Sequence, residues 1–469
     1  MKIALMHYHL KTGGVTTVVR QQAEALKNDA DLLVMTGAEP DTNTSFDTIV
    51  IPSIGYDREG VTDQYPLKTA DAIFDALLLK WPDGCDVLHV HNPLLSKNRS
   101  LLTVLKILQE KGVRLFLQIH DFAEDGRPQF YYKEDYPSDC HYGVINSRDY
   151  DILKKAGLKK EGLHQIENTI HFHDPEPVDQ KYIRHILYPV RGIRRKNIGE
   201  TILLSLFFKS GLPVVITLPP NHEKDLKSYE GWKAYVQANG LNVRFGLGQT
   251  HSFEALIRSS AFIITTSINE GFGFSFIELW TAGKLIWGRM IPDICRDFKE
   301  KGVALDHFYE NLFVPVSWIG KSSLHEKMKN AWGRSLMYFN RIYDPMEFDV
   351  SFRQITQNGL IDFGMLDEAF QKQILSRVIS DSTAKTQLIA LNPFLLSPGN
   401  VPSYDTLIEK NRNAVKQFFT RDRYRRTLLD IYEKVMRTPV SHGIDKETLL
   451  SGFLNLDNMH LLKWYEDIS

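Results

Sequence analysis

Short apolar runs alternate with helical amphipathic patterns along roughly the first 290 residues of the chain. The runs are rich in β-branched residues and lack an exposed face, which is typical of strands buried in a parallel sheet. In the first part they cover residues 2–8, 31–36, 48–52, 87–91, 113–119, 142–145 and 164–170. Helical patterns fall between them, as at 67–79 and 101–109. This βα order predicts a parallel sheet covered by helices on both faces.

The same alternation begins again after a stretch at 171–180 that holds two prolines and several acids and reads as a linker. The second set of predicted strands is 186–190, 214–218, 243–246, 262–265 and 285–287. After about residue 292 helical patterns dominate, including 325–339, 366–380 and the basic amphipathic stretch 404–436. The pattern therefore predicts an α/β protein with two tandem doubly wound, Rossmann-like domains and a helical C-terminal extension. We place them at 1–175, 176–400 and 401–469, with the last segment returning toward the first domain.

Composition narrows the class of protein. The 469 residues include 43% hydrophobic and 24% charged residues, with a net charge of −1, which argues against a general nucleic-acid binder. Three widely spaced cysteines, Cys85, Cys140 and Cys295, form neither a disulfide framework nor a zinc motif and indicate a cytoplasmic protein. No signal peptide or membrane-spanning run is evident, although a peripheral membrane contact stays open. The oligomeric state is not indicated.

The stretch 266–278 is the strongest candidate for chemistry. An apolar strand leads into a loop with Gly271 and Gly273, and apolar residues at helical spacing follow from Phe276. Backbone N–H groups and a helix dipole at such a loop can hold a phosphate. Glu270 and Glu278 flank it and would suit hydroxyl groups on a sugar and a ribose. A structural alternative exists for Glu278, since residues 275–278 also form a helix capping box.

Other candidates follow predicted strands. Gly13 and Gly14 follow the first strand and form either a close approach for a ligand or a simple tight turn. His120 and Asp121 follow the strand at 113–119, where a histidine can bind a sugar, transfer a proton or merely end the strand. His89 and His91 share a strand face and suggest a metal site, but no third ligand stands at a fixed spacing. We therefore expect no metal.

Arg191 and Lys196 flank a strand-to-helix turn in the second domain. Two cations there would neutralise a departing diphosphate, or they simply form a solvated basic turn. The chain has neither a serine nucleophile elbow nor a Walker phosphate loop, and 246–248 lacks the third glycine of a dinucleotide fingerprint. NAD binding is not expected.

Taken together, these features resemble glycosyltransferase family 4, a retaining family of GT-B architecture. The resemblance covers about residues 1–290. It rests on Arg191 and Lys196 separated by four residues, Glu270 and Glu278 separated by seven, the glycines after the first strand, and His120-Asp121. Asn168 at the end of the last first-domain strand also matches, as does 418–435, which looks like the family's closing helix. Two departures are Thr169, where glycine is usual, and Lys284, where proline is common.

The resemblance implies a nucleotide-sugar donor, a hydroxyl acceptor and no required cofactor. Arg191 and Lys196 would hold the diphosphate, Glu270 and the backbone of Phe272, Gly273 and Phe274 the transferred sugar, and Glu278 the ribose. His120 would contact the donor sugar, and Gly14 and Asn168 would complete the donor site. The leaving diphosphate would assist the incoming hydroxyl, so that Arg191, Lys196, Glu270 and His120 would carry catalysis.

The acceptor is predicted from cations in the first-domain loops. These are Lys11, Arg58, Lys97, Arg99 and Arg127. Such a cluster suits a phosphate or carboxylate, and the chain is weakly similar to members that glycosylate glycerate or glucosylglycerate derivatives. Lys97, Arg99, Asp121 and Arg127 are the predicted acceptor residues. The alternatives are a lipid-linked or glycan acceptor at a membrane surface, and a nucleotide-sugar binding protein without turnover. The segment 294–393 has no assigned role beyond a helical insertion.

Overall fold

The chain divides into two compact units, which are described separately. The computed structural model describes residues 1–41, 44–57, 65–174, 184–209, 211–399, 401 and 404–464. Unit 1 comprises Met1–Ile170 and Phe419–Leu454, and unit 2 comprises His171–Phe418 and Asn455–Ser469. The chain thus passes from one unit to the other three times, after residues 170, 418 and 454. The predicted boundary near 175 lies among undescribed residues, while the predicted tail from 401 is shared between the two units.

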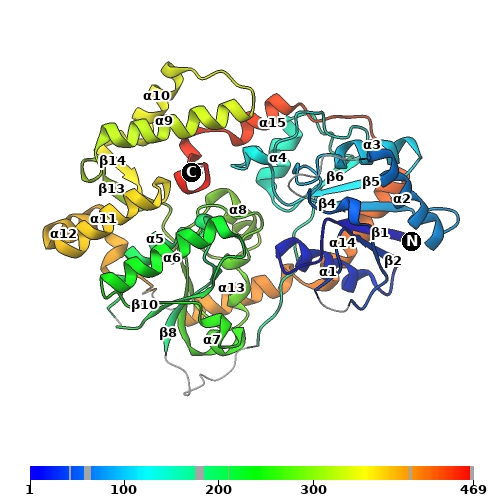
Figure 1. Ribbon diagram of the computed structural model, residues 1–469. Helices are drawn as coiled ribbons and strands as arrows, with labels where there is room; N and C mark the ends of the chain where they lie inside the picture. The colour runs from blue at the N-terminus through cyan, green and yellow to red at the C-terminus, as the bar shows by residue number, and fades with distance from the viewer. Residues whose placement is uncertain are drawn as a thin grey trace. The chain divides into compact units, whose positions relative to one another are not determined.

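Unit 1 contains a seven-stranded sheet in the order β3-β2-β1-β4-β5-β6-β7 (Figure 1). The strands are β1 Lys2–His7, β2 Asp31–Thr36, β3 Thr48–Val50, β4 Val87–His91, β5 Leu115–Ile119, β6 His141–Val144 and β7 Leu163–Gln165. Every pair is parallel; Ile3, for example, aligns with Leu32 on one side and Val87 on the other. The predicted strand at 164–170 is shorter than expected, because the chain beyond Gln165 leaves the sheet.

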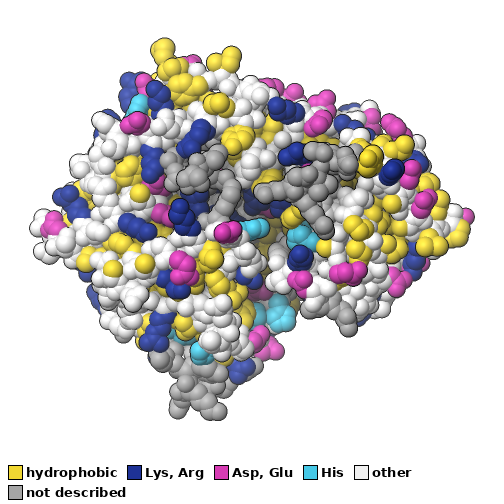
Figure 2. Space-filling model, viewed as in Figure 1, with side chains coloured by type: hydrophobic (Ala, Val, Ile, Leu, Met, Phe, Trp, Pro, Cys, Tyr) yellow, Lys and Arg dark blue, Asp and Glu magenta, His cyan; other side chains and the backbone are white. Residues whose placement is uncertain are grey.

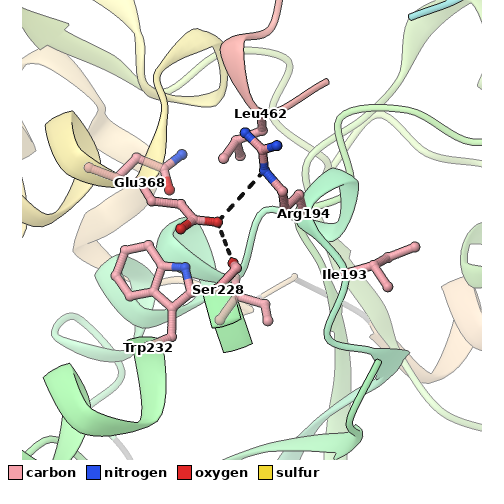
Figure 3. A pocket seen from close by; sticks show the side chains of 8 residues that line it. Ile193, Arg194, Ser228, Trp232, Glu368 and Leu462 are labelled. Carbon is pink, nitrogen blue, oxygen red and sulfur yellow. Dashed lines mark hydrogen bonds and ion pairs between the residues drawn. The ribbon is translucent and has the colours of Figure 1, made fainter. Parts of the chain in front are cut away.

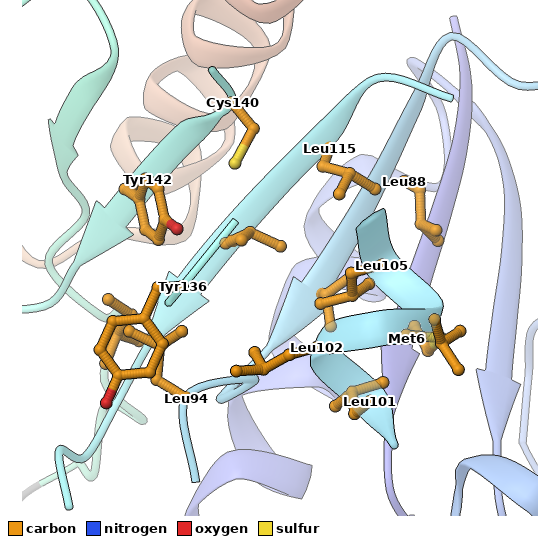
Figure 4. Packing of buried hydrophobic residues seen from close by; sticks show 14 of the residues in the cluster. Met6, Leu88, Leu94, Leu101, Leu102, Leu105, Leu115, Tyr136, Cys140 and Tyr142 are labelled. Carbon is orange, nitrogen blue, oxygen red and sulfur yellow. The ribbon is translucent and has the colours of Figure 1, made fainter. Parts of the chain in front are cut away.

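Helices cover both faces of this sheet, as the uninterrupted apolar strands require. One face carries α2 Pro66–Lys80 and α3 Leu101–Glu110, and the other carries α1 Gly14–Leu26 and α14 Arg421–Arg437. α4 Ser147–Lys155 precedes β7 and contacts α15 Lys446–Phe453. Figure 4 shows apolar side chains of α3 and the sheet within one buried cluster, among them Leu101, Leu102, Leu105, Met6, Leu88 and Leu115. Truncating a buried leucine such as Leu105 would cost about 2–5 kcal/mol.

Unit 2 contains a five-stranded parallel sheet in the order β10-β9-β8-β11-β12. Its strands are β8 His185–Arg191, β9 Val214–Leu218, β10 Val243–Phe245, β11 Ser260–Thr265 and β12 Ile286–Gly288. The helices between them are α5 Ile198–Ser205, α6 Glu223–Ala238 and α7 Phe253–Ser259. The predicted pair of doubly wound sheets is confirmed.

The segment 294–393 is less purely helical than the sequence suggests. It holds most of α8 Pro292–Glu300 and all of α9 Lys321–Tyr338, α10 Pro345–Ile355, α11 Glu368–Ser380 and α12 Ser382–Leu391. It also contains an antiparallel pair of short strands, β13 Phe313–Pro315 and β14 Leu360–Asp362. Strands of three residues carry too little periodicity to be recognised in a sequence.

The basic stretch 404–436 forms two helices instead of one. α13 Tyr404–Phe418 belongs to unit 2, and α14 begins after Thr420, whose side chain accepts a hydrogen bond from the Arg423 N–H as an N-cap. The apolar residues of α14, including Leu428 and Tyr432, pack into unit 1. After α15 the chain returns to unit 2 with η11 Leu456–Asn458 and α16 Leu461–Trp464.

Candidate active site

Each sheet has a point where the strand order reverses, and polar residues gather there. In unit 2 the reversal lies between β8 and β11, and in unit 1 between β1 and β4. Ligands of open parallel sheets bind beyond the carboxyl ends of the strands at such points, because diverging connections leave a crevice there. In unit 2 the chain beyond these ends is the turn 192–197 and the loop 266–273, which hold the predicted phosphate residues.

A buried ion-pair cluster forms where this turn and loop meet. Lys196 ends the short helical turn η3 Arg194–Lys196, and its Nζ donates a short hydrogen bond to Glu270 Oε1. Arg195 Nη1 donates to Glu270 Oε2 at 3.1 Å and to the carbonyl oxygen of Asn269 at 2.9 Å. Only 12% of the Lys196 side chain and 9% of the Glu270 side chain are exposed, whereas 32% of the Arg195 side chain is exposed. Two cations and one carboxylate leave this buried cluster with a net positive charge, which suits an anion.

The pKa values in the cluster follow from burial and charge. Burial opposes ionisation of Glu270, but Lys196 and Arg195 outweigh it and lower the pKa of Glu270 to about 2. Burial also lowers the pKa of Lys196, against the attraction of Glu270. Glu270 is therefore ionised throughout the neutral range. Arg195 was not among the predicted site residues; its place beside Lys196 in a basic turn was the only available signal.

The backbone of the turn is held by neighbouring hydroxyl groups. The Lys196 carbonyl oxygen accepts hydrogen bonds from Tyr188 OH at 2.7 Å and Thr266 Oγ1 at 3.0 Å. Thr266 Oγ1 also lies 3.1 Å from the carbonyl oxygen of Asn197. Tyr188 lies on β8, and Thr266 directly follows β11. The two strands at the reversal point therefore fix the position of the Lys196 backbone.

Arg191 points to a different part of the site. Its Nη1 donates to Asn221 Oδ1 at 2.5 Å and to the Pro219 carbonyl oxygen at 3.3 Å, both in the loop after β9. The structure thus pairs Lys196 with Arg195 at Glu270, and it ties Arg191 to the neighbouring strand's loop. A role for Arg191 at a diphosphate stays a prediction.

Glu278 lies in a different environment from Glu270. The predicted helix from Phe276 is wrong: two 3-10 turns, η5 Phe274–Phe276 and η6 Glu278–Trp280, replace it. The capping box is absent as well, since Ser275 Oγ is buried without a hydrogen-bond partner in the described part of the chain. The Glu278 carboxylate instead accepts a hydrogen bond from the His171 backbone, and burial raises the pKa of Glu278 to about 7.

The loop between the two glutamates is tightly packed. Gly273 has a φ of +89°, and a Cβ there would lie 2.9 Å from both Ile294 Cγ2 and Phe276 Cδ2. Both the conformation and the space therefore require glycine. Phe272 is buried against Phe274 and Phe298, with ring centroids 4.9 and 5.6 Å away. The aromatic side chains anchor the loop whose backbone was predicted to hold the sugar.

At the reversal point of unit 1 the polar residues are histidines. His120 Nε2 lies 3.1 Å from His91 Nδ1, and the two rings stack with centroids 5.4 Å apart. Burial lowers the pKa of His120 to about 4, against the opposing effect of Asp121. Asn92, at a φ of +57°, orients the loop by accepting from the backbone N–H groups of His120 and Asp121 at 3.1 and 3.0 Å. His120 is therefore neutral and held in place.

His89 and His91 also take part in hydrogen bonds, His91 through Nδ1 to His120, while its Nε2 is buried without a hydrogen-bond partner among the described residues. His89 Nδ1 lies 2.8 Å from Tyr432 OH, and its Nε2 lies 3.0 Å from Gln118 Oε1. Across the described residues, no group of three or more His, Cys, Asp and Glu side chains is placed to hold a metal ion.

The predicted acceptor residues lie in unit 1, partly paired. Arg127 and Asp121 form an ion pair at 3.0 Å. Lys97 Nζ donates to Tyr56 OH at 3.0 Å and lies 5.7 Å from the centre of the Phe130 ring. The Arg99 side chain is 82% exposed and 3.8 Å from Asp57. Arg58 lies outside the described residues. The described acceptor residues thus combine cations with aromatic side chains. Each cation has a different neighbour, and their binding of one acceptor stays a prediction.

The remaining predicted positions have distinct surroundings. Gly14 begins α1, and a Cβ there would have open space around it. Asn168 is buried, with no described partner for its Oδ1. Lys284 Nζ donates to the carbonyl oxygens of Arg258 and Ser260, both at 2.9 Å, which gives that departure from the family pattern a structural role.

The surface seen in Figure 2 carries Lys, Arg, Asp and Glu side chains interspersed, in keeping with the net charge of −1. That face shows no continuous basic area of the kind that follows a nucleic-acid backbone. Among the helices that the structure describes, none combines the length and the apolar character needed to cross a bilayer.

Two doubly wound parallel sheets in tandem are the architecture of the GT-B class of glycosyltransferase folds, and the similar proteins below have that fold. No family model matches the chain. It is 25% identical to mannosylglucosyl-3-phosphoglycerate synthase of Petrotoga mobilis, over 98% of this chain and 99% of that protein.

Solved structures agree with this class. Sucrose-phosphate synthase of Thermosynechococcus elongatus has a TM-score of 0.54 at 14% identity, covering 92% of this chain and 98% of that one. Anabaena HepE in complex with UDP-glucose has a TM-score of 0.51 at 13% identity, covering 93% and 99%. At these identities the structures show the fold. With the curated relative, they confirm the predicted resemblance to GT-B glycosyltransferases.

Proposed function

We propose that the protein is a retaining glycosyltransferase of family 4 that moves a hexose from a nucleotide-diphosphate sugar to a small anionic hydroxyl compound. The observation that carries the proposal is the buried cluster of Lys196, Arg195 and Glu270 at the reversal point of unit 2. A buried cationic site at strand ends suits a diphosphate, and the full-length likeness to a synthase of a phosphoglycerate glycoside supports the acceptor class.

In this assignment unit 2 binds the donor. Lys196 and Arg195 bind the diphosphate, with Arg191 contributing from the neighbouring loop. Glu270 and the 272–274 backbone bind the transferred sugar, and Glu278 binds the ribose hydroxyls. Since Glu270 already holds both cations, the donor would enter a site whose charges are in position before it arrives, which reduces the reorganisation needed during reaction.

The bond between the anomeric carbon and the diphosphate oxygen breaks, and a bond from that carbon to the acceptor oxygen forms on the same face. The departing diphosphate takes the acceptor's proton, so the protein need not supply a nucleophile. Its contribution is charge: Lys196 and Arg195 stabilise the negative charge that grows on the diphosphate as the bond breaks.

Unit 1 supplies the acceptor residues in this proposal. Lys97, Arg99 and Arg127 suit a phosphate or a carboxylate, since guanidinium and ammonium groups form charge-assisted hydrogen bonds with both. His120, with Asp121 beside it, contacts the transferred sugar as a neutral hydrogen-bonding group. Gly14 and Asn168 complete the unit 1 contribution.

The first experiment is a thermal-shift panel of UDP, GDP, UDP-glucose and GDP-mannose, because a ligand of the native state raises the melting temperature. The donor with the largest shift is then incubated with 3-phosphoglycerate and glucosyl-3-phosphoglycerate. We expect a glycoside that keeps the donor's anomeric configuration by NMR. An inverted product would reject the retaining chemistry, and the absence of any shift would reject donor binding.

A further inference from the structure

The segment 294–393, which the sequence left without a role, contacts the turn that holds Lys196. Helix α11 does so at two points. Its Glu368 lies 3.9 Å from Arg194 Nε and accepts a hydrogen bond from Ser228 Oγ, as Figure 3 shows. One turn further along the same helix, Gln371 Nε2 donates to Asn197 Oδ1 at 2.8 Å. The turn is therefore held from outside the doubly wound sheet as well as from within it.

Asn197 is the central residue of this contact. It follows Lys196 directly, is fully buried and has a φ of +52°, a left-handed conformation that asparagine tolerates better than most residues. Its side chain bonds in two directions, because Nδ2 donates to Glu200 Oε2 at 2.8 Å while Oδ1 accepts from Gln371. Asn197 thus links the start of α5 to α11.

The close approach of α11 depends on a glycine. A Cβ at Gly199 would lie only 2.2 Å from Gln371 Oε1 and 2.7 Å from the Trp232 ring. Helix α5 therefore needs a glycine at position 199, because any larger residue would clash with the Gln371 side chain. Gln371 Nε2 also lies 3.3 and 3.2 Å from the carbonyl oxygens of Phe363 and Leu366, so that the loop after β14 fixes its orientation.

The other side of Asn197 leads to a buried charged network. Glu200 accepts two hydrogen bonds from Arg289, at 2.8 Å from Nε and 2.6 Å from Nη2, and one from Tyr309 OH at 2.6 Å. Arg289 also donates twice to Asp362, both at 2.8 Å, and to the Glu310 carbonyl oxygen at 2.9 Å.

All five N–H groups of the guanidinium are therefore used. Such a network adds little net stability, because desolvating three charges offsets their attraction, but it fixes geometry since any displacement leaves a buried charge unpaired. Glu200 lies on α5, Arg289 follows β12 and Asp362 ends β14. Their bonds join the segment 294–393 to the first turn of α5.

We propose that Asn197 is a positioning residue that transmits the geometry of this network to Lys196. This inference rests on the proposed function, in which Lys196 binds the diphosphate. Asn197 does not touch the donor itself. It keeps the Lys196 backbone in the one conformation that directs Nζ toward Glu270, and the segment 294–393 contributes to turnover through Gln371 and Asp362.

The test is a double-mutant cycle on turnover, with Asn197→Gly and Lys196→Ala made singly and together. Glycine accepts the positive φ, so Asn197→Gly removes the two side-chain hydrogen bonds without backbone strain. We expect Asn197→Gly to lower kcat roughly tenfold while the donor KM changes less than about threefold. In the Lys196→Ala background it should change kcat by less than about twofold, because the group it positions is gone.

Asn358→Gly is the matched control, since Asn358 is exposed with a φ of +58° and should lose no activity. If Asn197→Gly does not fold, Gln371→Met takes its place, because it removes one bond to Asn197 from a different helix and keeps the side-chain volume. Full additivity with Lys196→Ala, or an unchanged kcat in Asn197→Gly while Lys196→Ala loses turnover, would overturn the inference. If Lys196→Ala itself keeps full turnover, the proposed function fails instead, which separates the two outcomes.

Discussion

The two sheets place different kinds of polar group at corresponding points. At the reversal point of unit 2, Lys196 and Arg195 pair with a glutamate whose pKa they lower to about 2. At the reversal point of unit 1, His120 stacks on His91, and burial lowers the pKa of His120 to about 4. Near pH 7 one point is therefore permanently charged, and the other is neutral and hydrogen-bonded.

This difference suggests that the two sheets bind different chemical groups. A charged site stabilises the charge that develops on a diphosphate, whereas a neutral imidazole recognises hydroxyl groups without adding charge. A second comparison lies inside unit 2, between Glu270 beside two cations and Glu278, which has His173 Nε2 at 3.9 Å and whose pKa burial raises to about 7.

The largest expected effect comes from removing the charge at Lys196. We expect Lys196→Ala to raise the reaction barrier by roughly 2–4 kcal/mol, about 30- to 1,000-fold in kcat, with a smaller change in donor KM. Lys233→Ala, which changes an exposed lysine of unit 2 paired with Glu230, is the control. Equal activity of the two variants in steady-state assays would contradict a role for the Lys196 charge in the reaction.

His120 tests the neutral half. His120→Ala should lower kcat by about tenfold, the loss of one hydrogen bond to the sugar. Because His120 is neutral above about pH 5, the pH profile between 6 and 8 should keep its shape. His164→Ala removes another buried, hydrogen-bonded histidine of unit 1 and should leave kcat near that of the parent. If the parent protein shows a rise or fall of kcat between pH 6 and 8 that His120→Ala lacks, His120 titrates during the reaction.

The raised pKa of Glu278 leads us to expect that donor binding depends on pH. Its carboxyl group is mostly protonated below pH 7, and the ionised form accepts ribose hydroxyl groups more strongly. Affinity for UDP-glucose or GDP-mannose, whose diphosphate has no group that titrates in this range, should therefore rise as the pH increases from 6 to 8, by up to about tenfold, since only roughly one-tenth of Glu278 is ionised at pH 6. Isothermal titration at three pH values measures this.

The control for that experiment is Glu278→Gln, which should show weaker binding with a flat profile over the same range. Glu270 does not titrate between pH 6 and 8, so it contributes nothing to the slope. A flat profile in the parent protein would mean that the ribose does not bind at Glu278. Early melting of the variant with normal binding would make Glu278 a structural residue only.

The smallest expected effect is at Arg99. Its side chain is largely exposed, so Arg99→Ala should raise the acceptor KM only a few-fold and leave the donor KM unchanged. Equal changes in both constants would contradict the assignment of this residue to the acceptor. Sedimentation of the protein with anionic liposomes, lost in the variant, would favour a lipid-linked acceptor.

The sequence was sufficient for the two sheets because apolar strands and amphipathic helices produce distinct periodicities. It was insufficient where the periodicity was short or misleading. Phe276, Ile277 and Trp280 have helical spacing, yet close packing around Gly273 leaves only 3-10 turns there. The strands β13 and β14 have three residues each, too few to show alternation.

The candidate site was predictable only in part. Lys196 and Glu270 follow strands that neighbour each other in the sheet, and the structure brings their side chains into contact, while their roles at a donor stay a prediction. Arg195 was missed, since nothing in a basic turn indicates which cation points inward. The network of Glu200, Arg289 and Asp362 joins residues 73 or more positions apart, and no local sequence pattern predicts such contacts.

The central claim is that the Lys196 cluster binds a nucleoside diphosphate, and isothermal titration with UDP and GDP tests it most directly. The account predicts that one of them binds the parent protein and the Lys233→Ala control equally. Its affinity should fall at least tenfold in Lys196→Ala, because the free diphosphate carries the charge that Lys196 stabilises. Equal affinity in Lys196→Ala and the parent, or no binding of either nucleotide to the parent, would contradict the account.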